Sequence, residues 1–150
     1  METILIRAAV PSEKAEIEAL QLRASLTNSR DRDALLANPG AIEVPTEQLA
    51  GGRVFLAELK GAFVGFAAVE PRADGETELD GLFVEPEIRR RGIGRLLLEH
   101  AAQVARRNGS AALYVVGNPH AQEFYIACGF NSIGTTQTRF GVALLFKKMF

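Results

Sequence analysis

Hydrophobic residues along the chain follow two spacings, one typical of strands and the other of helices. Short apolar runs rich in β-branched residues predict strands, and Lys60-Gly61 between two such runs is typical of a hairpin turn. Gly81 lies inside another run, where a glycine indicates a bulge or a close approach of backbone. The expected strands cover residues 3–9, 53–59, 62–69, 76–84 and 112–116, followed by two closing strands within 130–148.

Apolar residues three and four positions apart predict the helices. The first helix is expected to begin with Ser12 as its N-cap and to bury Ile17, Leu20 and Ala24. A long amphipathic helix follows the arginine run 89–91 and ends at Asn108-Gly109. Two shorter helices are expected over residues 29–37 and 119–127, whereas 40–52 carry no clear pattern and are expected to form a loop.

This order of elements indicates a single α/β (α+β) domain over residues 1–150, with one central, mostly antiparallel sheet flanked by helices. A chain of this length buries enough surface to fold without a disulfide or a metal. Cys128 is alone and His100 and His120 are the only histidines, so no metal is expected. The N-terminal residues do not resemble a signal peptide, and no apolar run reaches about 18 residues. The expected compartment is therefore the cytoplasm, without a membrane partner.

Charge is nearly balanced overall but concentrated in one place. The 17 basic and 18 acidic residues argue against a general nucleic-acid-binding surface. Arg89, Arg90, Arg91 and Arg95 nevertheless crowd the start of the long helix, beside Gly92 and Gly94. The unpaired backbone N–H groups and the dipole of a helix start favour a phosphate there. The third small residue of a dinucleotide fingerprint is missing, and no P-loop sequence occurs. A solvent-exposed arginine run that merely caps the helix remains the alternative.

A second set of residues follows the strand over 112–116. Asn118 follows it after Gly117, Phe124-Tyr125 lies one to two helical turns later, and Gly129-Phe130 closes that helix. At this point the chain resembles the GNAT superfamily of acetyl-CoA-dependent N-acetyltransferases. The run 89–94, Arg-Arg-Arg-Gly-Ile-Gly, matches the acyl-CoA signature Q/R-x-x-G-x-G/A of that family. The resemblance extends over nearly all of the chain and implies the GNAT acyl-CoA N-acyltransferase fold.

The resemblance also implies how acetyl-CoA would be bound. The family holds it in a V-shaped opening between the strand ending at Val84 and the strand ending near Gly117, with the pyrophosphate over the arginine loop. Tyr125 matches the tyrosine that donates a proton to the leaving thiolate, although it could instead be a core aromatic. Asn118 would orient the pantetheine, cap the following helix, or do both. The residues implied to contact the cofactor are Leu82, Phe83, Val84, Arg89, Arg90, Arg91, Gly92, Ile93, Gly94, Arg95, Asn118 and Phe124.

The general base is left open between two acids. Glu78 and Asp80 alternate with apolar residues on the strand before the loop, so either could face the acceptor and take the amine proton, or both could be solvated charges. Some family members carry a glutamate on the strand that leads to the asparagine. Here that strand reads Leu113-Tyr114-Val115-Val116, without an acid.

The expected function is transfer of an acetyl group from acetyl-CoA to a primary amine by direct attack in a ternary complex. The acceptor would be a small molecule or a peptide, and a homodimer is possible on the same resemblance. The alternative is a non-catalytic module of the same fold that binds or senses acyl-CoA. A nucleic-acid partner is disfavoured by the charge balance.

Overall fold

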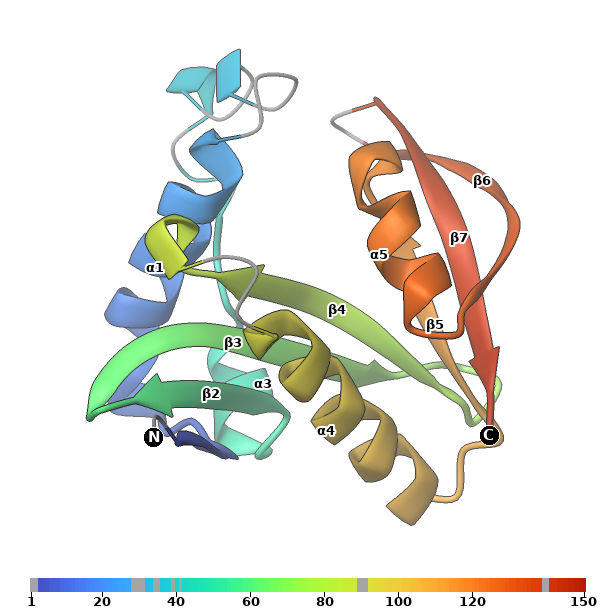
Figure 1. Cartoon of the computed structure of the whole chain (residues 1–150), viewed down its shortest axis with the longest axis horizontal. Helices are drawn as coiled ribbons and strands as arrows, with labels where there is room; N and C mark the ends of the chain where they lie inside the picture. Colours follow the sequence, from blue (N-terminus) through green and yellow to red (C-terminus); the bar gives the residue numbers. More distant parts are fainter. Residues whose placement is uncertain are drawn as a thin grey trace. The chain divides into compact units, whose positions relative to one another are not determined.

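The computed structural model describes residues 3–27, 32–33, 36–38, 40, 42–88, 92–138 and 141–150. The strands are β1 (Ile4–Ala8), β2 (Val54–Leu59), β3 (Ala62–Pro71), β4 (Thr77–Val84), β5 (Ala112–Gly117), β6 (Asn131–Thr138) and β7 (Gly141–Met149). The helices are α1 (Lys14–Leu26), α3 (Thr46–Ala50), α4 (Ile93–Arg107) and α5 (Gln122–Ala127), joined by short 3₁₀ turns (Figure 1). None of the described helices is long and apolar enough to cross a membrane.

The strands form a seven-stranded mixed sheet in the order β1-β2-β3-β4-β5-β7-β6. Antiparallel pairing joins β1 to β2, β2 to β3, β5 to β7 and β6 to β7, whereas β4 and β5 run parallel. The predicted α+β class and mostly antiparallel sheet are therefore confirmed. The contacts divide the chain into two compact units, 1–68 with 81–98 and 69–80 with 99–150.

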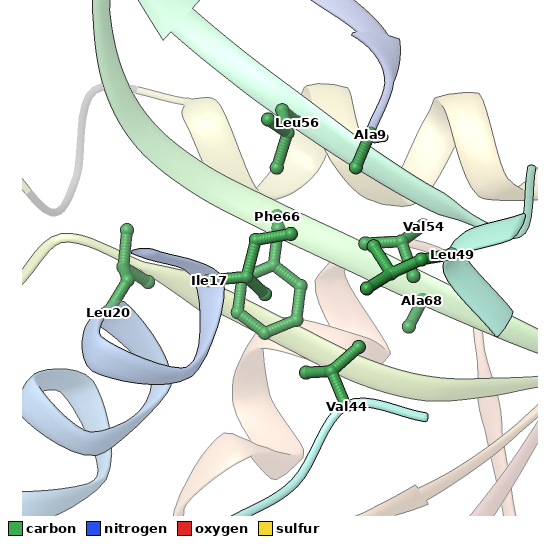
Figure 2. Close-up of a cluster of buried hydrophobic side chains, with 9 residues drawn as sticks. All are labelled: Ala9, Ile17, Leu20, Val44, Leu49, Val54, Leu56, Phe66 and Ala68. Carbon is green, nitrogen blue, oxygen red and sulfur yellow. The ribbon is translucent and has the colours of Figure 1, made fainter. Parts of the chain in front are cut away.

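The core of the first unit is built where α1 and α3 cover β2 and β3. Ile17 and Leu20 from α1 are fully buried beside the ring of Phe66 from β3, which confirms the predicted apolar face of this helix (Figure 2). Each such side chain contributes about 1.5–3 kcal/mol when it is removed from water. The cluster consists of Ala9, Ile17, Leu20, Val44, Leu49, Val54, Leu56, Phe66 and Ala68.

Backbone conformation confirms one predicted turn and corrects the start of the first helix. Lys60 and Gly61 have φ of 52° and 79°, the left-handed pair that a two-residue hairpin of type I′ requires. Ser12 is not the N-cap of α1, because Pro11–Glu13 form a 3₁₀ turn and the helix begins at Lys14. The Glu13 carboxylate reaches back to accept a hydrogen bond from the Val10 N–H at 3.0 Å, which makes Val10 the capping position of that turn.

The segment expected to be a loop over 40–52 contains the helix α3, so that expectation was wrong. Only Gln48 and Leu49 of its five residues are buried, and two positions cannot establish a helical period. The helix expected over 29–37 lies largely outside the described residues, although 32–33 and 36–37 are helical.

The second unit contains the first half of β4, up to Asp80, together with β5, β7, β6 and the helix α5. Thr77–Leu79 of β4 pair in parallel register with Leu113–Val115 of β5. A buried hydrogen bond of 2.7 Å links the hydroxyls of Thr77 and Ser110. The Glu76 carboxylate accepts hydrogen bonds from the N–H groups of Ala111 and Ala112, both at 2.8 Å. These polar contacts fix the start of β5 beside the start of β4.

Candidate active site

Between two hydrogen bonds that link β3 to β4, the β4 side of the pair has one residue more than the β3 side. The Arg72 N–H donates to the Glu76 carbonyl at 2.7 Å, and the Glu85 N–H donates to the Val64 carbonyl at 2.8 Å. From Glu76 to Glu85 the chain makes nine residue steps, whereas the opposing stretch from Val64 to Arg72 makes eight. The extra residue on the β4 side requires a β-bulge there. Gly81 lies within this stretch, which is consistent with the bulge that the sequence predicted near it. A Cβ on Gly81 would meet the Phe83 ring at 3.2 Å, so a larger residue would also be crowded.

The end of β4 presents its backbone groups alternately to the two edges of the strand. The Glu85 N–H points to β3, and the Phe83 carbonyl lies 3.0 Å from where a Cβ of Gly65 on β3 would be. Because successive residues of a strand direct their N–H and C=O groups to opposite edges, those of Leu82 and Val84 point away from β3. Of the three residues expected to pair with the pantetheine, only Leu82 and Val84 have backbone groups suited to it. Phe83 instead packs its ring on Phe66, with 5.3 Å between centroids.

The start of α4 is shaped by a glycine in a left-handed conformation. Gly92 has φ of 79°, is exposed, and would place a Cβ in open space. Its carbonyl accepts the first helical hydrogen bond, from Leu96 N–H at 3.1 Å. The backbone N–H groups of the first helical turn thus follow a turn that only glycine adopts without strain.

The other residues expected to contact the phosphates differ in how far their side chains are exposed. Ile93 is 1% exposed and its side chain packs against Gly65, so only its backbone can meet a ligand. Gly94 is half-buried in the first turn of α4, and Arg95 is exposed. Arg89, Arg90 and Arg91 lie outside the described residues.

An ion pair that the sequence does not signal joins α1 to the end of β4. Arg23 donates two hydrogen bonds to the Glu85 carboxylate, at 2.9 and 2.7 Å. The pairing lowers the pKa of Glu85 below its ordinary value and raises that of Arg23. The two residues are 62 positions apart, so no local spacing reveals the contact. It fixes the first residue beyond the strand that bears Leu82 and Val84.

Tyr125 lies in an aromatic cluster of the second unit, where Figure 1 shows α5 beside β7. Its ring centroid is 5.2 Å from that of Phe124, 5.6 Å from Phe130 and 5.1 Å from Phe146. The residue is 7% exposed, and burial raises its pKa well above the ordinary value. The ring therefore belongs to the core, as one interpretation of the sequence expected, and the proton-donor role of the hydroxyl stays a prediction.

No hydrogen-bond partner for the hydroxyl of Tyr125 occurs within the described residues. A role of this hydroxyl toward a bound group stays a prediction.

Asn118 caps the short turn that precedes α5. Its Oδ1 accepts a hydrogen bond from the His120 N–H at 3.4 Å, and Pro119 occupies the first position of the turn. The capping role expected from the sequence is confirmed, and a role toward the pantetheine stays a prediction. His120 is exposed, and burial lowers the pKa of His100 on α4. No group of three potential metal ligands occurs among the described residues.

Glu78 and Asp80 have different surroundings on β4. Glu78 is half-buried, and desolvation raises the pKa of its carboxyl despite the nearby Arg72. Asp80 is exposed. A carboxylate with a raised pKa accepts a proton more readily at neutral pH, which makes Glu78 a candidate base.

Sequence reasoning missed the residues around Glu78. Tyr114 on β5 is the register partner of Glu78 on one side and of Lys147 on the other. The Arg72 guanidinium lies 3.9 Å from the centroid of the Tyr114 ring. Because Tyr114 lies between the buried residues Leu113 and Val115, alternation along β5 could have predicted that its side chain lies on the other face of the sheet from theirs. No local pattern could have predicted its contact with Arg72.

Comparisons with known proteins concern the family and the fold of the chain. The model of the "Acetyltransferase (GNAT) family" matches residues 19–130, well over half of the chain. The structure is similar to a PaiA N-acetyltransferase from Thermoplasma acidophilum in complex with coenzyme A, with a TM-score of 0.81, 16% identity, and 99% of each chain covered. It is also similar to a GCN5-related N-acetyltransferase from Rhodopseudomonas palustris, with a TM-score of 0.80, 22% identity, and 99% and 96% covered.

A longer protein contains the same fold. N-acetylglutamate synthase from Neisseria gonorrhoeae, complexed with coenzyme A and N-acetyl-glutamate, gives a TM-score of 0.73 at 21% identity, with 98% of this chain and 35% of that one covered. At such identities these structures establish the fold alone. No curated protein sequence matches the chain.

Proposed function

The chain belongs to the acetyltransferase (GNAT) family, and on this premise we propose that it transfers an acetyl group from acetyl-CoA to a primary amine. The observation that carries the proposal is Gly92, which turns the chain at a positive φ into the start of α4 with open space over its α-carbon. This feature stands at the glycine of the acyl-CoA signature. A phosphate can approach the backbone closely there, where the dipole of a 15-residue helix favours negative charge.

The cosubstrate would be held along β4 and at the start of α4. Leu82 and Val84 would hydrogen-bond the amide groups of the pantetheine, because their backbone groups face away from β3. Gly92, Gly94 and Arg95 would bind the pyrophosphate together with the arginine run 89–91. Asn118 and Phe124, which flank Tyr125 along the chain, would complete the set of cofactor contacts proposed from the resemblance.

The chemistry requires a base for the amine and a donor for the thiolate. Glu78 would accept a proton from the acceptor ammonium, with Asp80 the second candidate for this role. The amine nitrogen then forms a bond to the thioester carbonyl carbon, and the C–S bond breaks with its electron pair leaving on sulfur. The nitrogen loses its second proton as the neutral amide forms, which replaces the proton that Tyr125 gives up. The Tyr125 hydroxyl would donate a proton to that thiolate. Burial raises its pKa and so keeps the hydroxyl protonated at neutral pH, although it also makes the phenol a weaker acid.

Two measurements test the proposal. Isothermal titration should show binding of acetyl-CoA, and a thiol-release assay over a panel of primary amines and short peptides should identify an acceptor. Absence of binding at millimolar acetyl-CoA would refute the proposal. Binding without thiol release for any acceptor would instead support a non-catalytic acyl-CoA-binding module of the same fold.

A further inference from the structure

Arg72 lies at the centre of a cluster on the second unit that includes Glu78. Its guanidinium carbon is 3.9 Å from the centroid of the Tyr114 ring, and its Nη1 is 3.6 Å from Glu78 Oε1. Its Nε donates to Asp74 at 3.2 Å. One arginine thus contacts an aromatic face and two carboxylates at once.

The backbone of Arg72 is held by a tight hairpin turn. Its N–H donates to the Glu76 carbonyl at 2.7 Å, and its carbonyl accepts from the Gly75 N–H at 3.1 Å. Gly75 has φ of 86°, the left-handed position that such a three-residue loop requires. Asp74 accepts a further hydrogen bond from the Glu76 N–H at 3.0 Å, so the partner of the guanidinium is itself fixed to the turn. The guanidinium therefore projects from a rigid base.

The contacts leave Glu78 only partly neutralised. The 3.6 Å separation is longer than a hydrogen bond, so Arg72 acts on Glu78 mainly through its charge. Both side chains are about one-third exposed, at 34% and 32%, which keeps the attraction modest. Glu78 retains hydrogen-bonding capacity for a second cationic group on its other oxygen.

Other charges face Glu78 from the surrounding elements. Asp80 lies two residues along the same strand and raises the pKa of Glu78. Glu70 is opposite it on β3 in the register that the hairpin sets. Lys147 of β7 lies beyond Tyr114, with its Nζ 5.2 Å from the ring centroid. Among these groups, Arg72 is the cation that approaches the carboxylate.

We propose that Arg72 is a positioning residue for Glu78, clamped by Tyr114 and Asp74 so that its charge keeps the Glu78 carboxylate ionised and oriented. This inference rests on the proposed function, in which Glu78 accepts the proton of the acceptor amine. Stacking on Tyr114 prevents Arg72 from folding over both oxygens, which leaves one oxygen for the amine. Arginine suits the task because its planar guanidinium stacks on an aromatic face and keeps its charge.

The direct test is a carboxyl ¹³C NMR titration of the whole protein, with the Glu78 signal assigned by its loss in Glu78→Gln. In Arg72→Gln the Glu78 midpoint should move to higher pH, since the nearby cation is gone. Arg72→Lys should restore part of the shift. Tyr114→Leu removes the stacking platform and keeps the charge of Arg72, so its Glu78 midpoint should lie between those of the native protein and Arg72→Gln. This variant provides the test where Arg72→Gln does not fold. An unmoved midpoint in folded Arg72→Gln and Tyr114→Leu would overturn the inference.

A second readout separates this inference from the proposed function. With an acceptor in hand, the acidic limb of kcat/KM should move with the NMR midpoint, and Arg72→Gln should lose about two- to five-fold in kcat/KM on that limb. Arg106→Gln is the matched control, because Arg106 lies 5.6 Å from the Phe150 ring but is not among the charges facing Glu78. A shifted midpoint with no acetyl transfer in the native protein refutes the proposed function and leaves the ion pair intact. A shifted midpoint with an unmoved acidic limb overturns the positioning role.

Discussion

The ring of Tyr125 lies directly against Gly117 at the end of β5. A Cβ at Gly117 would be 3.1 Å from Tyr125 Cε2 and 3.0 Å from Phe146 Cε2. Real Cβ atoms rarely make contacts this short, and both neighbours belong to rigid rings in the core. The absence of a side chain at Gly117 is thus what allows Tyr125 to occupy its position.

Gly117→Ala should therefore destabilise the protein and displace Tyr125. Overpacking of this kind costs about 1–3 kcal/mol, because rings cannot yield as flexible chains do. Urea unfolding followed by circular dichroism should show an earlier midpoint, and turnover should fall with it. Gly40→Ala is the control, since a Cβ there meets nothing within 4 Å. Equal stability of the two variants would contradict the packing argument.

Tyr125→Phe should separate the chemical role of this residue from its packing role. The three aromatic contacts of the ring survive, so stability and acetyl-CoA affinity should change little. Turnover should fall about 100-fold or more if the hydroxyl donates to the thiolate. Because burial raises the pKa of Tyr125, the native enzyme should show no loss of rate from its ionisation up to about pH 10, the ordinary tyrosine value. Unchanged turnover in the variant would remove the donor role.

Gly92→Ala should weaken acetyl-CoA binding more than it weakens the fold. At a φ of 79° alanine is strained by about 1 kcal/mol, and its Cβ would occupy the space that a phosphate needs. Calorimetric titration should show at least a ten-fold rise in Kd. Gly52→Ala is matched for strain, with φ of 70° and open space around it, and should leave the affinity unchanged. The same loss of affinity in both variants would show that strain alone is responsible.

Glu76→Ala should destabilise the second unit. The Glu76 carboxylate accepts hydrogen bonds from two consecutive backbone N–H groups at the start of β5, and its removal leaves both without that partner. The expected loss is about 1–3 kcal/mol in the free energy of unfolding. Glu99→Ala removes an exposed glutamate from α4 and should be nearly neutral. Equal denaturation midpoints for the two variants would disprove the structural role of Glu76.

Arg23→Gln should lower stability by a small, pH-dependent amount. The pKa of Glu85 is lowered in the folded state by Arg23, so the pair stabilises the fold above the unfolded carboxyl pKa. This contribution is lost as the pH falls through the folded pKa. The difference between the variant and the native protein should be about 0.5 kcal/mol at pH 7, because Arg23 is 51% exposed, and should vanish in strong acid. A difference that persists at pH 2 would point to packing.

Local sequence patterns predicted most elements because their physical causes are local. The spacing of Ile17, Leu20 and Ala24 alone requires one buried helical face, and Lys60-Gly61 suits a two-residue hairpin whatever surrounds it. The helix α3 escaped prediction because it is only five residues long, and a tertiary contact rather than a period buries Leu49. The expected cap at Ser12 was wrong because Pro11–Glu13 form a 3₁₀ turn that Val10 caps, so that Ser12 lies inside this turn and the helix begins only at Lys14.

The sequence by itself determined the family, the order of elements and the residue types at the candidate site, since glycine spacing, arginine clustering and the Asn118–Phe130 pattern are properties of the chain. Only the tertiary structure decided how these groups are placed and what surrounds them. It turned the Phe83 backbone toward β3, buried Ile93, placed the Tyr125 ring against Gly117, and set Arg72 over Tyr114 beside Glu78. Each of these depends on strand register and packing between residues distant in sequence, and therefore on free energies that no local pattern contains.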